Sequence, residues 1–346
     1  MRYVDLRHRG TQKLELNGIT DASTDSEYLL LEAAGITRSR LFAIQTEEAS
    51  EKTVQKYEEL ITRRSNHEPL QYILGNQDFM GYCIRCTPDV LIPRLDTEIL
   101  VENAFRRLTE LSDLKMSQAD EKSNTDFSKA LQEKENTDYE IRNGFSKNTI
   151  INSVSQRNLR TNKDNLAVIN YLDVCTGSGC IPIAIECMYR DKINGKKCVL
   201  ESLASDISEK ALDVARENAE ANGAAVRFVQ SNLWEKITGS YDLITSNPPY
   251  IETEVIKGLM PEVNAHEPMI ALDGGADGMD FYRRLCKSAP EYLNNGGWML
   301  MEIGNTQGNA VAEMMTEAGF SSVRVIRDLA GLDRVVEGKM LRTHIS

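Results

Sequence analysis

The segment of this sequence best suited to chemistry is an asparagine followed by two prolines and a tyrosine, Asn247-Pro248-Pro249-Tyr250. Consecutive prolines fix two φ angles and remove two backbone donors, so they hold the carboxamide and the neighbouring carbonyls in one rigid arrangement. The resulting slot is lined with hydrogen-bond acceptors and suits a planar NH2 group. Taken alone, the same four residues could also form a rigid turn after a strand.

A carboxamide is one planar group that such a slot could hold. Its nitrogen is a poor nucleophile because the lone pair is delocalised into the carbonyl, so a transferase must orient the NH2 group and favour charge growing on nitrogen. The Asn247 side chain and the Pro248 carbonyl can do both, and Tyr250 adds an aromatic face. No strong base is needed, and in-line placement lowers the barrier by roughly 7 to 11 kcal/mol. We predict Asn247, Pro248 and Tyr250 as catalytic residues, and these three with Pro249 as the substrate-binding site.

A glycine loop and an aspartate form a second group of candidate site residues. The loop, Cys175-Thr176-Gly177-Ser178-Gly179, leads into a helical pattern, and Asp206 ends the next apolar run. Small residues let a ligand approach the backbone, a helix start offers free N–H donors, and a carboxylate beyond the second strand can bind ribose hydroxyls. A turn that needs positive φ and a helix cap would explain the same residues without a ligand. Together they favour a cofactor that contains adenosine.

Short apolar runs alternate with helical patterns in the second half of the chain. The runs cover residues 168–174, 199–205, 226–229, 241–246, 298–303, 323–326 and 334–337. The helical patterns cover residues 180–189, 209–221, 278–292 and 306–318. This alternation predicts an α/β fold with an open, mostly parallel sheet. Ligands of such sheets bind at the carboxyl ends of the strands, where the glycine loop, Asp206 and Asn247 all fall.

The first part of the chain has a different pattern. Apolar residues recur at three- and four-residue steps between residues 25 and 64, which predicts a small helical domain. Residues 77–92 suit a β-hairpin, and a helix through about Leu108 should then open at Asp96 or Thr97, either of which could cap it.

These elements divide the chain into a helical domain (1–75), a hairpin linker (76–92) and an α/β domain (93–346). Within the last, residues 111–165 are dominated by Lys, Asn, Ser, Glu, Asp and Gln, which predicts a polar, poorly ordered insertion. Such a segment could bind a partner or be a tolerated surface insertion.

The composition restricts the class of partner. The 346 residues include 40 Lys and Arg against 52 Asp and Glu, a net charge of -12, so we expect no direct binding of nucleic acid. No signal peptide and no stretch of about 18 apolar residues is present, which predicts no membrane association. Seven cysteines without a secretory leader predict reduced thiols in a cytoplasmic protein, and no metal site is expected.

Several further runs, together with Asn-Pro-Pro-Tyr, are typical of one enzyme family. They are residues 68–75, residues 91–94 with Thr97 and Glu98, then Glu267, Pro268, Ala271, Leu272, Gly274, Gly275 and Gly278, and residues 328–331 with Asp333 and Arg334. With them, nearly the whole chain apart from the insertion resembles the HemK/PrmC family. Its members are protein-glutamine methyltransferases that modify the Gly-Gly-Gln loop of peptide chain release factors.

The resemblance implies a class I, Rossmann-like, seven-stranded methyltransferase domain behind a helical bundle that docks the release factor. It implies S-adenosyl-L-methionine as cofactor, with the glycine loop and Asp206 on its methionine and ribose parts. Asn232 and Leu233 would flank the adenine, and Asn247 would contact both cofactor and substrate glutamine. Three positions depart from the family pattern: Cys175 replaces the usual first glycine, Asn232 an aspartate, and Leu95 a second proline. None of these changes removes a catalytic group.

Two other functions fit part of the sequence. A nucleic-acid adenine N6-methyltransferase also binds a planar, conjugated amino group, but it needs a basic channel that the net charge of -12 does not favour. A catalytically idle release-factor-binding protein would be expected to lack Asn247 or Asp206, and both are present. We expect a monomeric enzyme whose partners are release factors.

Overall fold

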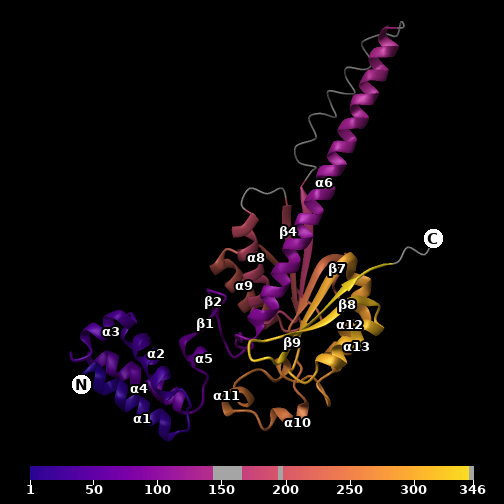
Figure 1. Cartoon of the computed structure of the whole chain (residues 1–346). Coiled ribbons are helices and arrows are strands. Elements are labelled where there is room, and N and C mark those ends of the chain that lie inside the picture. The colour runs from indigo at the N-terminus through magenta and orange to yellow at the C-terminus, as the bar shows by residue number, and fades with distance from the viewer. Residues whose placement is uncertain (143–165, 194–197, 343–346) are drawn as a thin grey trace.

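The structure is a computed structural model that describes residues 1–142, 166–193 and 198–342 (Figure 1). The helices are α1 (Tyr3–Leu16), α2 (Ala22–Ala34), α3 (Arg38–Ile44), α4 (Glu51–Ser65), α5 (Leu70–Leu74), α6 (Thr97–Arg142), α8 (Cys180–Ile193), α9 (Glu209–Asn222), α10 (Thr253–Ile256), α11 (Pro261–Asn264), η1 (Met269–Ala271), α12 (Asp280–Tyr292) and α13 (Gly308–Glu317). The strands are β1 (Asn76–Phe79), β2 (Tyr82–Arg85), β3 (Ala167–Val174), β4 (Cys198–Asp206), β5 (Val226–Gln230), β6 (Tyr241–Ser246), β7 (Leu293–Glu302), β8 (Phe320–Arg327) and β9 (Asp333–Met340).

Strands β3 to β9 form one seven-stranded sheet in the order β5-β4-β3-β6-β7-β9-β8. Neighbours run parallel from β5 through β7, while β9 is antiparallel to both β7 and β8. The expected α/β fold with a mostly parallel, seven-stranded sheet is confirmed, and each predicted apolar run overlaps one strand. Strands β4 and β6 lie on opposite sides of β3, so the chain order of the strands reverses at β3. The loops after these three strands therefore border one crevice.

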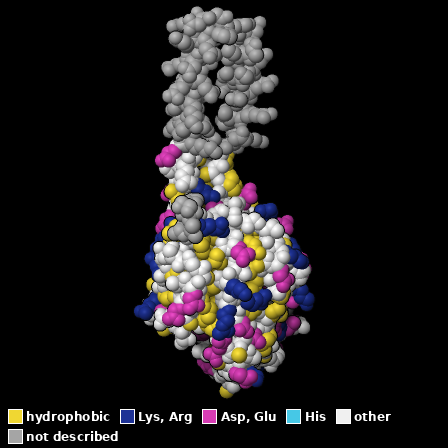
Figure 2. All heavy atoms as spheres, turned by 90° about the vertical axis from the view of Figure 1, so that its right-hand side faces the viewer, with side chains coloured by type: hydrophobic (Ala, Val, Ile, Leu, Met, Phe, Trp, Pro, Cys, Tyr) yellow, Lys and Arg dark blue, Asp and Glu magenta, His cyan; other side chains and the backbone are white. Residues whose placement is uncertain are grey.

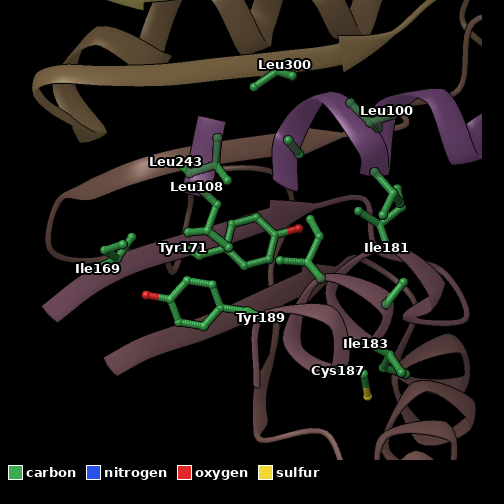
Figure 3. Close-up of a cluster of buried hydrophobic side chains, with 14 of the residues drawn as sticks. Leu100, Leu108, Ile169, Tyr171, Ile181, Ile183, Cys187, Tyr189, Leu243 and Leu300 are labelled. Carbon is green, nitrogen blue, oxygen red and sulfur yellow. The ribbon is translucent and has the colours of Figure 1, made fainter. Parts of the chain in front are cut away.

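Helices cover both faces of the sheet. Side chains of α6 and α8 form one core with the sheet, and those of α12 and α13 form the other. Successive strand residues point to opposite faces, so Tyr171 joins the first core and Leu172 the second. Figure 3 shows Leu108 of α6 beside Tyr171, in the cluster that also contains Leu100. Burying one leucine such as Leu172 contributes about 1.5 to 3 kcal/mol, so the two layers fix the sheet that positions the crevice.

Helices α1 to α5 enclose a separate, smaller core and lie to one side of the sheet (Figure 1). The antiparallel hairpin of β1 and β2 follows them. Arg64 of α4 joins the two regions, because its buried side chain pairs with Asp25 of α2 at 2.7 Å and with Glu262 of α11 at 3.0 Å. His67 Nδ1 lies 3.2 Å from the same Glu262 carboxylate. The helical region is therefore tied to the segment that follows Tyr250.

Helix α6 is longer than predicted. The sequence indicated a helix to about Leu108 and a poorly ordered insertion from 111, whereas α6 continues to Arg142. Its first turns past the predicted end still pack on the core, since Leu111 and Ser112 are buried, and Lys115 pairs with Asp242 of β6 at 2.6 Å. The remainder of the insertion, residues 143–165, lies outside the described residues.

The surface mixes both signs of charge. On the face drawn in Figure 2, lysine and arginine side chains alternate with aspartate and glutamate rather than forming one basic field. Within the described ranges, no helix combines the length and apolarity that crossing a membrane requires. In the same part of the chain, no group of three His, Cys, Asp or Glu side chains could hold a metal ion.

Candidate active site

A cavity of about 310 Å³ opens at the carboxyl ends of β3, β4 and β6. Nine of the predicted site residues line it: Cys175, Thr176, Gly177, Ser178, Asp206, Asn232, Leu233, Asn247 and Pro249. The lining also includes Arg94 from the segment before α6, Thr97 at the start of α6, and Phe281 of α12. The cavity thus gathers residues from distant parts of the chain at the edge where parallel strands end.

The glycine loop turns sharply after β3. The Thr176 N–H donates to the Ser205 carbonyl at 2.9 Å, which ties the loop to the end of β4. Cys175 and Gly177 have φ angles of 62° and 54°, in the left-handed region. A Cβ added at Gly177 would meet no atom within 4 Å, so this wall leaves open space for a ligand.

Gly179 does not line the cavity, unlike the other four residues of the loop. A Cβ there would lie 3.1 Å from the Ala215 Cβ, so this glycine permits close packing of α8 against α9.

Asp206 lies at the end of β4 with both carboxylate oxygens facing backbone donors. Oδ2 accepts from the Gly177 N–H and Oδ1 from the Ser208 N–H, each at 2.9 Å. Burial raises the pKa of Asp206, while these N–H groups oppose the shift. The carboxylate therefore links the glycine loop to the start of α9 and still lines the cavity.

Asn232 and Leu233 lie in the loop after β5 and line the same cavity. The Asn232 side chain accepts from Arg284 at 2.7 Å and donates to Glu235 at 2.8 Å, so its orientation is fixed by two surface side chains. Leu233 is buried, with a φ of 53°.

Asn247 directly follows β6. Its Nδ2 donates to the Thr97 hydroxyl at 3.3 Å, and both residues line the cavity. Of the three residues after it, Pro249 lines the cavity, whereas Pro248 and Tyr250 do not. The Tyr250 hydroxyl instead donates to Glu302 Oε1 at 3.3 Å, and burial raises its pKa.

The sequence reasoning missed Glu302. This side chain ends β7 and is only 1% exposed. Burial raises its pKa to about 7, against the opposing effects of Thr97, Arg334 and Tyr250. The sequence feature that could have identified it is a single carboxylate within the apolar run 298–303.

The segment after η1 supports the backbone of the tetrapeptide. Gly274 N–H donates to the Ile251 carbonyl at 2.8 Å, and a Cβ on Gly274 would lie 2.7 Å from Tyr250 Cα and 2.9 Å from the Pro249 oxygen. Gln307 Nε2 donates to the Tyr250 carbonyl at 3.0 Å. In the sequence, Gly274 is one of the residues that carry the resemblance to the family, and the structure gives a physical reason for a glycine there.

Comparisons with known proteins indicate one family. A PrmC N-terminal domain model matches residues 5–75, and a Methyltransferase small domain model matches residues 145–263. The release factor glutamine methyltransferase of Geobacter sulfurreducens is 33% identical over 324 residues, which cover 93% of this chain and 91% of that one. The protein of the same name from Cereibacter sphaeroides is 30% identical over 342 residues, 98% of this chain and 99% of that one. The chain therefore belongs to the family of release factor glutamine methyltransferases.

Proposed function

We propose that this protein uses S-adenosyl-L-methionine to methylate the side-chain amide nitrogen of the glutamine in the Gly-Gly-Gln motif of peptide chain release factors. The observation that supports this most is the position of Asn247 in the same cavity as the glycine loop and Asp206. A methyl donor and an acceptor amide can then meet in one enclosed space. The names of the relatives state the same activity.

The wall of the cavity fits an adenosine-containing sulfonium cofactor. Open space at Gly177 leaves room for the cofactor beside the backbone, and Asp206 retains lone pairs for ribose hydroxyls. Leu233, beside Asn232, offers an apolar surface to a base. When bound, S-adenosyl-L-methionine supplies an electrophilic methyl group on sulfur.

The residues around Asn247 orient the substrate amide. The Asn247 Oδ1 is the acceptor within the cavity for one hydrogen of a glutamine NH2 group. The backbone carbonyl of the adjacent Pro248, a residue outside the cavity lining, is the second acceptor in this proposal. The lone pairs of both acceptors stabilise the positive charge that develops on nitrogen as the new bond forms. Pro249 fixes this arrangement, since proline restricts φ, and Tyr250 holds the end of the tetrapeptide through Glu302.

The remaining regions have supporting roles in this proposal. The helical domain, residues 1–75, helps to dock the release factor, and residues 76–92 link it to the methyltransferase domain. The enzyme acts as a monomer in the cytoplasm, where release factors are found.

Intact-mass analysis of a purified release factor after incubation with enzyme and cofactor tests this function. Wild type should add one methyl group to the loop glutamine, and Asn247→Ala should lower the rate by about 100- to 1,000-fold. Asn309→Ala, at an exposed position of α13, is the matched control and should leave the rate unchanged. A release factor that gains no methyl group from the wild-type enzyme would refute the proposal.

The competing nucleic-acid function needs its own measurement. Labelled cofactor is offered with release factor and with duplex DNA in parallel reactions. Label that enters only DNA would establish the adenine methyltransferase. Failure to bind S-adenosyl-L-methionine in calorimetry would instead favour a catalytically idle binding protein.

A further inference from the structure

Asn247 can serve as an acceptor only in one of its two orientations. A carboxamide has an oxygen that accepts and an NH2 group that donates, and turning it by half a rotation exchanges them. With the oxygen facing the cavity, it can bind a substrate NH2 group. With the NH2 group there, two donors would face each other, so some neighbour must select the orientation.

Thr97 is the neighbour in contact. Its hydroxyl oxygen lies 3.3 Å from Asn247 Nδ2. Thr97 is the first residue of α6 and only 2% exposed, and its N–H donates to the Arg94 carbonyl at 3.0 Å. A hydroxyl can donate or accept, so Thr97 by itself would tolerate either orientation of Asn247.

Glu302 removes that ambiguity. Thr97 lies close enough to Glu302 for its hydroxyl to lower the pKa of this carboxyl group, against the effect of burial, which is what a donor beside the ionised form does. Oε1 accepts from Tyr250, while Oε2 is buried and has no hydrogen-bond partner within the described residues, so it is the acceptor toward which the Thr97 hydroxyl can turn. An ionised carboxylate only accepts, so Thr97 must donate to it. The Thr97 oxygen is then left to accept from Asn247, which turns Oδ1 toward the cavity.

We propose that Thr97 and Glu302 are positioning residues that fix the Asn247 carboxamide with its oxygen toward the substrate amide. This inference rests on the proposed function. Through Tyr250, Glu302 also holds the other end of the tetrapeptide, so one buried carboxylate sets both ends of the substrate slot.

The burial of Glu302 favours this role over simple packing. The carboxylate ends a strand whose last six positions are buried, and the other five of these positions hold glycine or apolar residues. A buried carboxylate oxygen without a partner is costly, and a residue of similar volume without charge would pack there at lower free energy. A functional requirement accounts for keeping the acid at this place.

The test compares Thr97→Val with Thr97→Ser in the full chain, at a pH well above that at which Glu302 is protonated. Valine keeps the branched shape and removes the hydroxyl, whereas serine keeps the hydroxyl. We expect Thr97→Val to lower kcat for release-factor methylation by about 10- to 100-fold, with KM and the cofactor Kd within about threefold of wild type. Thr97→Ser should restore most of kcat. Thr109→Val, which removes a half-buried hydroxyl from the same helix α6, should leave kcat unchanged.

A double-mutant cycle separates positioning from general damage. If Thr97 acts through Asn247, then Thr97→Val should cost nothing further in an Asn247→Ala background. An equal loss of kcat in both backgrounds would overturn the inference, as would an unchanged kcat in the single variant.

A readout without turnover keeps this test independent of the proposed function. The side-chain NH2 signals of Asn247, assigned by their absence in Asn247→Asp, should shift in Thr97→Val and stay in place in Thr109→Val. If these signals respond while wild type methylates no release factor, the positioning holds and the proposed function fails. If they do not respond, the positioning is wrong whatever the activity.

Discussion

Adding one methyl group at Gly274 should damage catalysis without touching the cofactor. A Cβ on this residue would lie 2.7 Å from Tyr250 Cα and 2.9 Å from both the Pro249 oxygen and the Tyr250 carbonyl carbon. All three are backbone atoms, which cannot rotate away as a flexible side chain can. Carbon atoms pack at about 3.5 to 4.0 Å, so Gly274→Ala must move the tetrapeptide backbone by roughly 1 Å.

The expected size of the effect follows from that displacement. A misplacement of about 1 Å in a positioned group can lower the rate by about 100-fold. Overpacking of this kind also destabilises the fold by about 1 to 3 kcal/mol. Steady-state kinetics with a release factor and thermal unfolding measure the two effects, and calorimetry should show an unchanged Kd for S-adenosyl-L-methionine.

Gly258 provides the matched control. It is exposed, and a Cβ there would make only an ordinary contact of 3.5 Å with the Val255 carbonyl. Gly258→Ala should therefore preserve both kcat and stability. If Gly274→Ala retained wild-type kcat, the backbone of the tetrapeptide would not need its present position, and the reasoning would be refuted.

Three further perturbations test other parts of the site. Asp206→Ala leaves the Gly177 and Ser208 N–H groups without their acceptor and should weaken cofactor binding more than tenfold in calorimetry. Cys175→Gly removes a side chain from a left-handed position with φ of 62°, so it should stabilise the fold by about 1 kcal/mol in urea unfolding and tighten cofactor binding. Burial raises the pKa of Glu302 from 4.5 to about 7, which means the folded state binds its proton more tightly than the unfolded chain. Wild-type stability relative to Glu302→Gln should therefore fall by about 3 kcal/mol as pH rises through that window, and a constant difference would contradict the burial argument.

The sequence predicted the sheet well because each strand leaves a local signal. All seven runs are short, apolar and separated by helical patterns, and these signals need no knowledge of distant contacts. The sequence signal of helix α1 is weaker. Its buried stripe contains only Leu6, Gly10 and Leu14, and the glycine is there because the Tyr57 hydroxyl occupies the space a side chain would need. A glycine at a core position weakens the prediction of a helix, because the neighbour that requires it is known only from the tertiary structure.

The site shows the same division between local and distant information. Asn247, Asp206 and the glycine loop follow strands directly, so their meeting could be inferred from strand order alone. Thr97 of α6 contacts Asn247 and Glu302 of β7 contacts Tyr250, and no spacing in the sequence relates Thr97 or Glu302 to the tetrapeptide. Asn232 is predicted to flank a cofactor base, and its pairing with Arg284 depends on where α12 lies relative to the loop after β5.

The bridge from Arg64 to Glu262 has a consequence for how the molecule responds to its surroundings. Dissolved ions weaken exposed charge pairs beyond a Debye length of about 8 Å at physiological ionic strength, but a shielded pair is affected much less. The side chains of Arg64 and Glu262 are 9% and 20% exposed. The orientation of the helical domain relative to the methyltransferase domain should therefore persist in concentrated salt. A release factor would then bind to two domains whose relative position is already fixed.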